Sequence, residues 1–240
     1  MNISIVIPAY NEEKRIRATL ENIFDYFSHK QTEFEIIVVD DGSSDQTVLT
    51  AKKSLPGFGN LQIISYGLNR GKGYAVKTGM LAAKGELILF CDADLSTPIE
   101  ELELFFPYVK QGFDVIIGSR KMPGASIEIC QPFYRRFMGK CFTLLTNLFL
   151  GIRVFDVTCG FKLFKKEAAG KIFQLQILEN WSFDSEILFI SRHLNYKIKE
   201  IPVRWRNSKY TKVRLSRDIL GSLCGLIQIR FNYWRGVYNA

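Results

Sequence analysis

Five short apolar runs, each leading into a stretch of helical character, constrain the fold of this chain most strongly. The runs occupy residues 3–8, 34–39, 61–65, 86–91 and 114–118. After the first run, apolar residues recur at helical spacing: Ile16, Leu20, Ile23, Phe24 and Phe27. Apolar strands that alternate with helices are typical of a largely parallel sheet covered on both faces. The pattern therefore predicts an α/β fold with a mostly parallel central sheet flanked by helices.

Polar residues gather just after these apolar runs. They form clusters at 10–12, 40–41, 69–73, 92–94 and 119–120. The carboxyl ends of parallel strands meet at one edge of a sheet, and ligands bind beyond that edge. The sequence therefore predicts that these five clusters converge on a single site.

The run 86–91 ends in two carboxylates, Asp92 and Asp94. At a strand end, the two-residue period points both side chains the same way. Like charges on one side repel unless a cation lies between them, and hard carboxylate oxygens suit Mg²⁺ or Mn²⁺ carrying a diphosphate. The pattern favours an enzyme that handles a nucleoside diphosphate. The alternative is a surface turn in which Asp94 caps a helix that begins near Pro98 and runs through Val109.

Four motifs of the first half, taken in order, resemble the family-2 inverting glycosyltransferases, which have the GT-A fold. They are Val-Ile-Pro-Ala-Tyr-Asn-Glu at 6–12, Val-Val-Asp-Asp-Gly-Ser-Ser-Asp at 38–45, Gly-Lys-Gly at 71–73 and Asp-Ala-Asp at 92–94. The second half is similar to the polyprenyl-phosphate branch, which contains the dolichyl-phosphate mannose synthases and dolichyl-phosphate beta-glucosyltransferases. Its motifs lie at 118–120, 132–136, 156–164, 181–186, 201–205 and 208–209. Cys-Gly-Phe-Lys-Leu-Phe and Trp-Ser-Phe-Asp look most like the beta-glucosyltransferases.

The resemblance implies a Rossmann-like GT-A domain in two halves, with C-terminal amphipathic helices. Residues 1–120 would bind the nucleotide sugar, 121–215 would bind the acceptor, and 216–240 would form a basic amphipathic helix at a membrane surface. The nucleotide pocket would be lined by Pro8, Tyr10, Glu12, Ala93 and either Asp40 or Asp41.

The resemblance also implies a metal and diphosphate site at Asp92 and Asp94, with Ser96 as a weaker third ligand. The cofactor would be Mg²⁺ or Mn²⁺. Lys72 would lie near the nucleotide. Its alternative role is in a strand-to-helix turn that uses the flexibility of the neighbouring glycines.

On the acceptor side, the resemblance implies that Arg120 and Arg135 face the acceptor phosphate. Ser208 and Lys209 would come from a mobile loop over the site. A phosphate monoester has a second pKa of about 6 and is already largely dianionic near neutral pH. It can attack the anomeric carbon without a general base, but it needs cations that bring two anions together. We therefore expect a single in-line displacement with inversion. The resemblance alone implies UDP-glucose as the first donor candidate and a GDP-mannose type as the other.

Two other functions remain open from the sequence. Transfer to a hydroxyl of a lipid or glycan would need a base, and Asp184 is the candidate; it could equally be the N-cap of a helix before 187–189. A non-catalytic protein that binds nucleotide sugars or lies at a membrane is the third candidate. The intact Asp92, Asp94 and Arg120 argue against it.

The net charge is +8, and basic residues are concentrated in the last segment. Such a charge suits either nucleic acid or an anionic membrane surface. Since no nucleic-acid-binding module is visible, we expect the membrane surface to be the partner and expect no binding of nucleic acid. Apolar stretches at 137–150 and 219–229 have basic and aromatic flanks but fall short of the roughly 20 residues that span a bilayer. Each could lie in the membrane interface or pack on the core or another subunit.

Localisation is predicted from the cysteines and the N-terminus. The five cysteines lack paired spacing, which favours reduced thiols in a cytosolic setting. Met1 leads directly into the first apolar run, so we expect no signal peptide. Together these features predict peripheral attachment at the cytoplasmic face of a membrane, or a separate membrane-anchoring partner. Nothing in the sequence indicates an oligomeric state.

Overall fold

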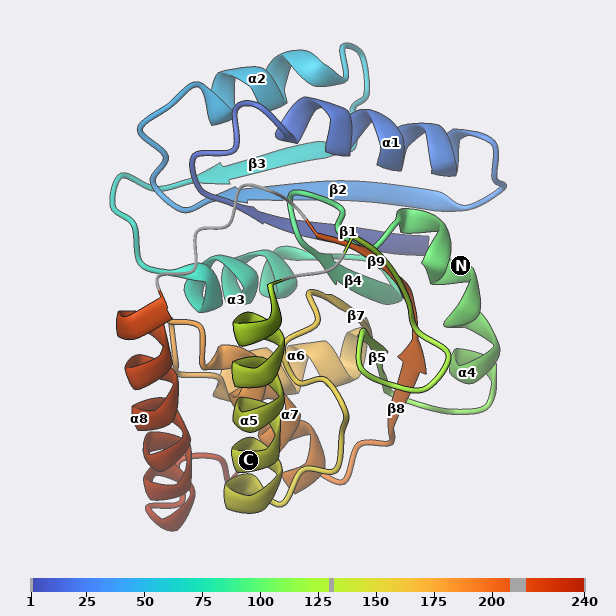
Figure 1. Ribbon diagram of the computed structural model, residues 1–240. Coiled ribbons are helices and arrows are strands. Elements are labelled where there is room, and N and C mark those ends of the chain that lie inside the picture. The colour runs from blue at the N-terminus through green and yellow to red at the C-terminus, as the bar shows by residue number, and fades with distance from the viewer. Residues whose placement is uncertain (1, 130–131, 208–214, 240) are drawn as a thin grey trace.

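The computed structural model describes residues 2–129, 132–207 and 215–239, and for 215–220 it describes the backbone. Its first half alternates strands and helices as expected. The elements are β1 (Asn2–Ala9), α1 (Ile16–Ser28), β2 (Glu33–Asp40), α2 (Thr47–Ser54), β3 (Leu61–Ser65), α3 (Lys72–Ala82), β4 (Leu87–Cys91) and β5 (Val115–Ser119). All five predicted strands are therefore confirmed (Figure 1).

The stretch between β4 and β5 differs from its prediction. In place of one helix through Val109, a 3-10 helix, η1 (Ile99–Leu104), is followed by a five-residue helix, α4 (Phe106–Lys110). Pro107 occupies the first turn of α4. Proline has no N–H to continue a helical ladder but is well suited to a helix start. The chain therefore begins a new helix at this point.

The second half completes the same sheet and adds a small one. Its elements are β6 (Ser126–Ile129), α5 (Phe133–Leu150), β7 (Phe161–Lys165), α6 (Lys166–Leu175), α7 (Phe183–His193), β8 (Ile198–Pro202), β9 (Arg204–Arg206) and α8 (Leu215–Trp234). The seven-stranded sheet has the order β3-β2-β1-β4-β7-β5-β8, and β6 pairs with β9 separately. Only β7 runs antiparallel to its neighbours β4 and β5; the remaining pairs of this sheet are parallel.

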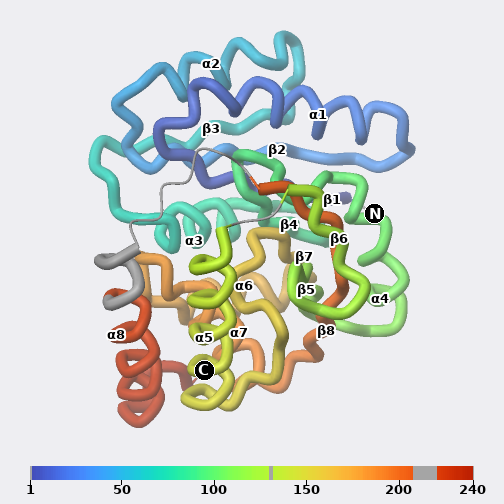
Figure 2. The backbone as a smooth tube through the Cα atoms, in the orientation of Figure 1, coloured from blue at the N-terminus to red at the C-terminus, as the bar shows by residue number. Residues whose placement is uncertain are grey.

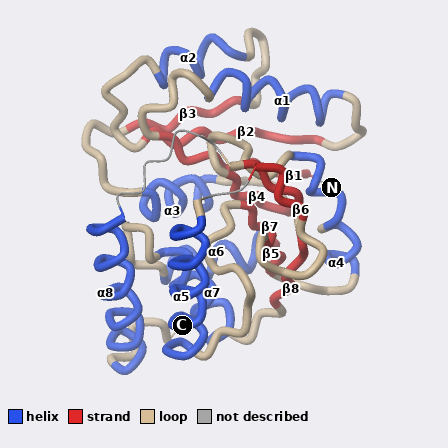
Figure 3. Tube along the Cα trace, viewed as in Figure 1, coloured by secondary structure: helices blue, strands red, loops and turns tan. Residues whose placement is uncertain are grey.

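Helices cover both faces of the sheet, and Figure 3 shows the strands between the two helical layers. Residues of β4 alternate between the two cores: Ile88 and Phe90 pack with α3, α6 and α7, whereas Leu87 and Leu89 pack with α1 and η1. This two-residue alternation follows from the pleat of a strand buried on both sides. Because β1 pairs in parallel with both β2 and β4, the carboxyl ends of these three strands lie at a common edge of the sheet.

Two long helices of the second half, α5 and α8, lie side by side (Figure 2). They contain the predicted apolar stretches 137–150 and 219–229. Several large apolar side chains on them face solvent, among them Phe133 (80% exposed), Leu148 (75%) and Trp234 (74%). Within the described ranges, no helix has both the length and the apolar character needed to cross a membrane.

Candidate active site at the carboxyl edge of the sheet

Asp41, just after β2, organises the loop that leads into α3. Its carboxylate accepts hydrogen bonds from the Tyr66 hydroxyl (3.0 Å), the Asn69 side-chain amide (2.9 Å) and the backbone N–H groups of Arg70 (2.8 Å) and Gly71 (2.9 Å). Both carboxylate oxygens therefore already have protein partners. This gives Asp41 a role in shaping the site.

Asp40, the last residue of β2, is the better placed of the two to meet a ligand. Its Oδ2 accepts hydrogen bonds from Ser65 Oγ (2.9 Å) and the Ser43 N–H (3.3 Å). Its Oδ1 is buried and has no hydrogen-bond partner among the described residues. A buried acceptor atom without a donor is unfavourable unless a ligand supplies one. An N–H of a nucleobase would satisfy it.

The end of β1 contributes the other predicted nucleotide residues. Pro8 is buried and Tyr10, two residues later, is 38% exposed; Ala93, which follows the neighbouring strand β4, is buried. Glu12 is buried, and its carboxylate accepts a hydrogen bond from Arg15 Nε (2.6 Å). These residues line the same sheet edge as Asp40.

Asp92 and Asp94 lie in a turn rather than in the strand, since β4 ends at Cys91. The Leu95 N–H donates to the Asp92 carbonyl (3.1 Å), and Leu95 has a left-handed φ of 43°. The prediction that strand alternation aligns the two carboxylates is therefore wrong. The turn sets the positions of the two carboxylates instead, because β4 ends at Cys91, one residue before Asp92. Ser96 follows this turn, and its N–H donates to Asp94 Oδ1 (3.0 Å).

Each carboxylate of this turn has its own cation. Lys72 Nζ lies 2.6 Å from Asp92 Oδ1, and Arg15 Nη1 lies 3.5 Å from Asp94 Oδ2. Lys72 therefore reaches the turn that carries Asp92 and Asp94, which favours its predicted nucleotide role over that of a turn residue. Burial, reinforced by the charge of Asp92, raises the pKa of Asp94. Additional positive charge would relieve this repulsion.

The turn fits a divalent metal. The described residues hold no cluster of three or more His, Cys, Asp or Glu side chains that could enclose an ion. The two carboxylates would leave other coordination positions to diphosphate oxygens and water, the arrangement usual for Mg²⁺. Gly160 keeps this space open: a Cβ there would lie 2.0 Å from Asp92 Oδ2.

The predicted acceptor cation Arg120 is held by a buried carboxylate. Its Nε and Nη2 donate to Asp156 at 2.6 and 2.8 Å, and Nη2 also donates to Thr158 Oγ1 at 2.9 Å. Lys121 Nζ lies 3.2 Å from the same carboxylate. Burial acts against ionisation, but the Arg120 guanidinium and Lys121 hold the pKa of Asp156 well below its usual range. Two cations around one carboxylate leave a net positive charge on this side.

Arg135 lies in the first turn of α5. Its Nε is buried and has no hydrogen-bond partner within the described part of the chain. An unpaired guanidinium N–H is a natural donor to a phosphate oxygen. Ser208 and Lys209, the other predicted acceptor residues, lie outside the described residues.

Asp184 is buried in the first turn of α7, beside a buried lysine. Ser182 is the N-cap residue of α7, and Asp184 lies in the first turn, so the N-cap prediction is wrong by two residues. Its carboxylate accepts a hydrogen bond from Lys162, which is fully buried on β7. Burial raises the pKa of Asp184, and the Lys162 ammonium opposes that change.

Arg15, Asp156 and Lys162 are the site residues that sequence reasoning missed. Each acts as the counter-ion of a predicted residue distant in the chain: Asp94, Arg120 and Asp184, respectively. The only sequence signal was a charged residue inside an apolar strand, at Lys162. A buried lysine is rarely found without a paired carboxylate.

Comparison with known proteins gives the following matches. The profile of Glycosyl transferase family 2 matches residues 4–173. The dolichyl-phosphate beta-glucosyltransferase of Homo sapiens is 33% identical over 251 residues, covering 99% of this chain and 77% of the human protein. The protein of that name from Saccharomyces cerevisiae is 34% identical over 256 residues, covering 99% of this chain and 76% of the yeast protein.

Solved structures share the fold. Mannosyl-3-phosphoglycerate synthase from Rubrobacter xylanophilus superposes with a TM-score of 0.72 at 18% identity, over 98% of this chain and 75% of that protein. The second is glucosyl-3-phosphoglycerate synthase from Mycobacterium tuberculosis in complex with Mn²⁺, UDP and glucosyl-3-phosphoglycerate. It superposes with a TM-score of 0.66 at 19% identity, over 95% of this chain and 79% of that protein. The GT-A fold expected from the sequence is therefore confirmed.

Proposed function

This chain belongs to glycosyl transferase family 2 and is a glycosyltransferase, and from that premise we propose that it transfers glucose from UDP-glucose to a polyprenyl phosphate such as dolichyl phosphate. The similarity to dolichyl-phosphate beta-glucosyltransferases over 99% of the chain is the observation that carries this proposal. The positive acceptor side supports it independently, since Arg135 Nε has no hydrogen-bond partner among the described residues.

The donor would bind along the ends of β1, β2 and β4. Asp40 Oδ1 would accept a hydrogen bond from the base, and Pro8, Tyr10, Glu12 and Ala93 would line the pocket. Lys72 would move toward the diphosphate, whose charge competes with that of Asp92. A GDP sugar is the second donor candidate, because guanine also offers N–H donors to a buried acceptor.

Asp92 and Asp94 would hold the divalent metal, Mg²⁺ or Mn²⁺, with Ser96 beside them. A metal bound there would offset the negative charge of the departing diphosphate. The side chains Lys72 and Arg15 would add positive charge around the same group. Charge stabilisation of a leaving group by preorganised cations is the main way such a site lowers a barrier.

On the acceptor side, Arg120, Lys121 and Arg135 would bind the lipid phosphate, with Ser208 and Lys209 beyond them. A phosphate oxygen forms a bond to the anomeric carbon, and the bond from that carbon to the diphosphate oxygen breaks with its electron pair. No proton needs to be removed, because the attacking oxygen is already ionised. Attack from the face opposite the leaving group inverts the anomeric centre.

The apolar surface of α5 and α8 would lie on a membrane, where the lipid acceptor resides. Basic residues border it, including Arg135 and Arg136 on α5 and Arg230 on α8. Helices with an apolar face and basic flanks bind anionic membrane interfaces. We assign the cytoplasmic face, in keeping with cysteines that lack paired spacing, and this surface could equally contact a membrane-anchoring partner.

Transfer to a hydroxyl is the second candidate function and would need Asp184 as base. The contact with Lys162 disfavours it, because a proton taken up by Asp184 would leave the fully buried Lys162 ammonium without its counter-ion. Asp184→Asn should abolish turnover but spare donor binding if a hydroxyl is the acceptor. Turnover near the wild-type value would exclude that reaction.

The test of the proposed function uses the purified chain with Mn²⁺ or Mg²⁺, radiolabelled nucleotide sugars and short-chain dolichyl phosphate. We expect label from UDP-glucose to move into the organic phase, with loss of transfer in Asp94→Asn. The matched control is Asp25→Asn, which removes an exposed carboxylate of α1. Polyprenol without phosphate should not be labelled. Donor binding without labelled lipid would reject the proposed acceptor, and no donor binding would reject the proposed reaction.

A further inference from the structure

The short strand β9 touches both sides of the active site. Its first residue, Arg204, meets η1, its second, Trp205, meets the acceptor cation Arg120, and its third, Arg206, meets the metal-site turn. Three consecutive residues of β9 therefore contact three separate segments from an earlier part of the chain. Such an element can set the spacing between the donor and acceptor halves of the site.

Glu101 of η1 fixes the first of these residues. One oxygen of its carboxylate accepts the Arg204 backbone N–H at 3.0 Å, and the other accepts Arg204 Nε. Glu101 is only 5% exposed, whereas the Arg204 side chain is half-exposed. A contact to both backbone and side chain of one residue holds its position along the strand. It therefore acts on the register of β9 as well as on charge.

The other end of β9 is bound to the turn that carries Asp94. The Arg206 N–H donates to the Ser96 carbonyl at 2.8 Å, and the Ser96 N–H donates to Asp94 Oδ1 at 3.0 Å. The position of β9 is thus linked to a predicted metal ligand by two successive hydrogen bonds. Between these two ends, the Arg120 guanidinium lies over the Trp205 ring at 5.4 Å.

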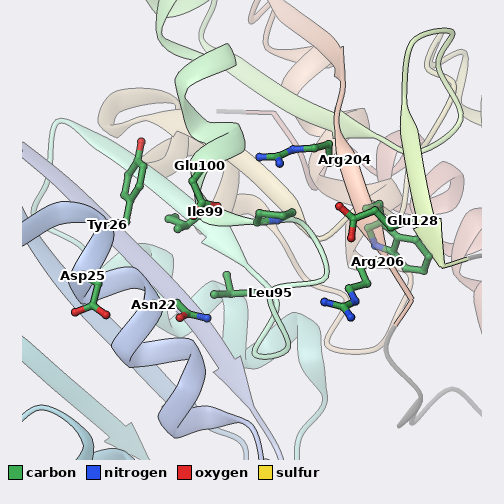
Figure 4. A pocket seen from close by; sticks show the side chains of 11 residues that line it. Asn22, Asp25, Tyr26, Leu95, Ile99, Glu100, Glu128, Arg204 and Arg206 are labelled. Carbon is green, nitrogen blue, oxygen red and sulfur yellow. The ribbon is translucent and has the colours of Figure 1, made fainter. Parts of the chain in front are cut away.

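An open groove beside β9 makes these polar contacts important. The groove has a volume of about 700 Å³ and separates β9 from α1; Asn22 and Tyr26 line one side and Arg204 and Arg206 the other. Figure 4 shows the side chains of Leu95 and Ile99 at its floor and those of β9 across from α1. Since the groove lies between α1 and β9, the contacts to Glu101 and Ser96 join β9 to the side that faces the metal-site turn, and they add to its ladder with β6.

We infer that Glu101 is a positioning residue: through Arg204 it holds β9 in register, and thereby holds Trp205 against the Arg120 that binds the acceptor phosphate. The inference rests on the proposed function for the identity of the acceptor. In the sheet, the nucleotide pocket around Asp40 lies across β4 from Arg120. The Glu101 carboxylate contacts Arg204, whereas the turn of Asp94 is bound to Arg206. Loss of the Glu101 carboxylate should therefore weaken acceptor binding selectively.

The experiment measures three quantities for Glu101→Gln: the KM for dolichyl phosphate, kcat, and the Kd for UDP with Mn²⁺ by titration calorimetry. We expect the acceptor KM to rise about tenfold, the size of effect seen when a hydrogen bond to a charged group is lost. The Kd for UDP should stay within about twofold of wild type. The matched control is Glu100→Gln, which removes an exposed carboxylate one residue away.

A second variant approaches the same contact from the exposed side and covers the case in which Glu101→Gln fails to fold. Arg204→Met removes the ion pair but keeps the backbone N–H that Glu101 accepts, so it should raise the acceptor KM by no more than Glu101→Gln does. The double variant should be no worse than Glu101→Gln alone, because both substitutions remove the same ion pair. An acceptor KM equal to that of the Glu100→Gln control would overturn the inference. So would a parallel rise in the Kd for UDP, or a lower unfolding temperature with unchanged kinetics. An inactive wild-type enzyme with this acceptor would instead reject the proposed function.

Discussion

Replacing Asp156 by asparagine tests whether the buried charge cluster around Arg120 stabilises the fold. The carboxylate has no exposed surface and accepts from both Arg120 and Lys121, each of which retains 19% exposure of its side chain. Asparagine keeps the shape but turns two cations into a buried pair without a counter-ion. Removing one partner of a buried ion pair costs 3–5 kcal/mol, and partial access of the cations to water favours the lower end, about 3 kcal/mol.

This loss converts into a shift of the unfolding midpoint. With about 2.1 cal/mol/K of unfolding entropy per residue, a chain of 240 residues has roughly 0.5 kcal/mol/K, so that 3 kcal/mol corresponds to about 6 °C. Differential scanning calorimetry at pH 7 measures it directly. Asp25→Asn, an exposed carboxylate on α1, is the control and should shift the midpoint by about 1 °C or less.

The pH dependence provides a second check. The pKa of Asp156 is lower in the folded state than in the unfolded state, where it is about 3.9. The contribution of Asp156 to the free energy of unfolding is therefore fully present above about pH 3.9 and is lost as the pH falls toward the folded-state pKa. The difference between wild type and Asp156→Asn should therefore be constant from pH 7 to about 5 and shrink below about 4. A variant that melts with the wild type at pH 7, or a difference that grows as the solution is acidified, would refute the reasoning.

Three further substitutions have expected outcomes. Gly160→Ala places a Cβ 2.0 Å from Asp92 Oδ2, and displacing that carboxylate should lower kcat about 100-fold while circular dichroism stays unchanged; normal kcat would show that the turn tolerates the shift. Asp41→Ala leaves the donors of the 66–71 loop unpaired and should weaken UDP binding about tenfold in calorimetry, a result that unchanged affinity would contradict. Tyr238→Phe removes the hydroxyl that donates to buried Glu186 at 2.7 Å and should lower the free energy of unfolding in urea by about 1–2 kcal/mol, with no such loss expected from the exposed Tyr134→Phe.

The strands of the first half were predictable because each is apolar and ends in a polar cluster. The position of β7 was not, because the sequence of Phe161–Lys165 does not say which strands it pairs with or in which direction, and only its pairing with β4 and β5 reveals an antiparallel insertion. Local pattern identifies a strand, but its partners depend on contacts between distant segments. The split of the helix after Pro98 had a visible signal in Pro107.

In the candidate site, too, some features could be predicted from local sequence and others depend on contacts between distant segments. Asp40, Asp92 and Asp94 follow apolar runs, so their shared edge follows from the topology of a parallel sheet. The ion pairs that hold Asp94 and Arg120 could not be read from the chain, since their partners Arg15 and Asp156 are ordinary charged residues in sequence. Spacing along a chain indicates which residues gather at an edge, and only the fold shows which of them neutralise one another.

The insertion of β7 between β4 and β5 also limits how this molecule can move. Strands from both halves of the chain hydrogen-bond in one continuous sheet, with β4 joined to β5 through β7. Rotating one half against the other would break three ladders of backbone hydrogen bonds, β4 with β7, β5 with β7 and β5 with β8, so the sheet offers no hinge between the two halves. The two substrates therefore meet on a rigid platform, and any closure over them falls to loops at its edge. Their distance of approach is then set by the fold itself rather than by the ligands.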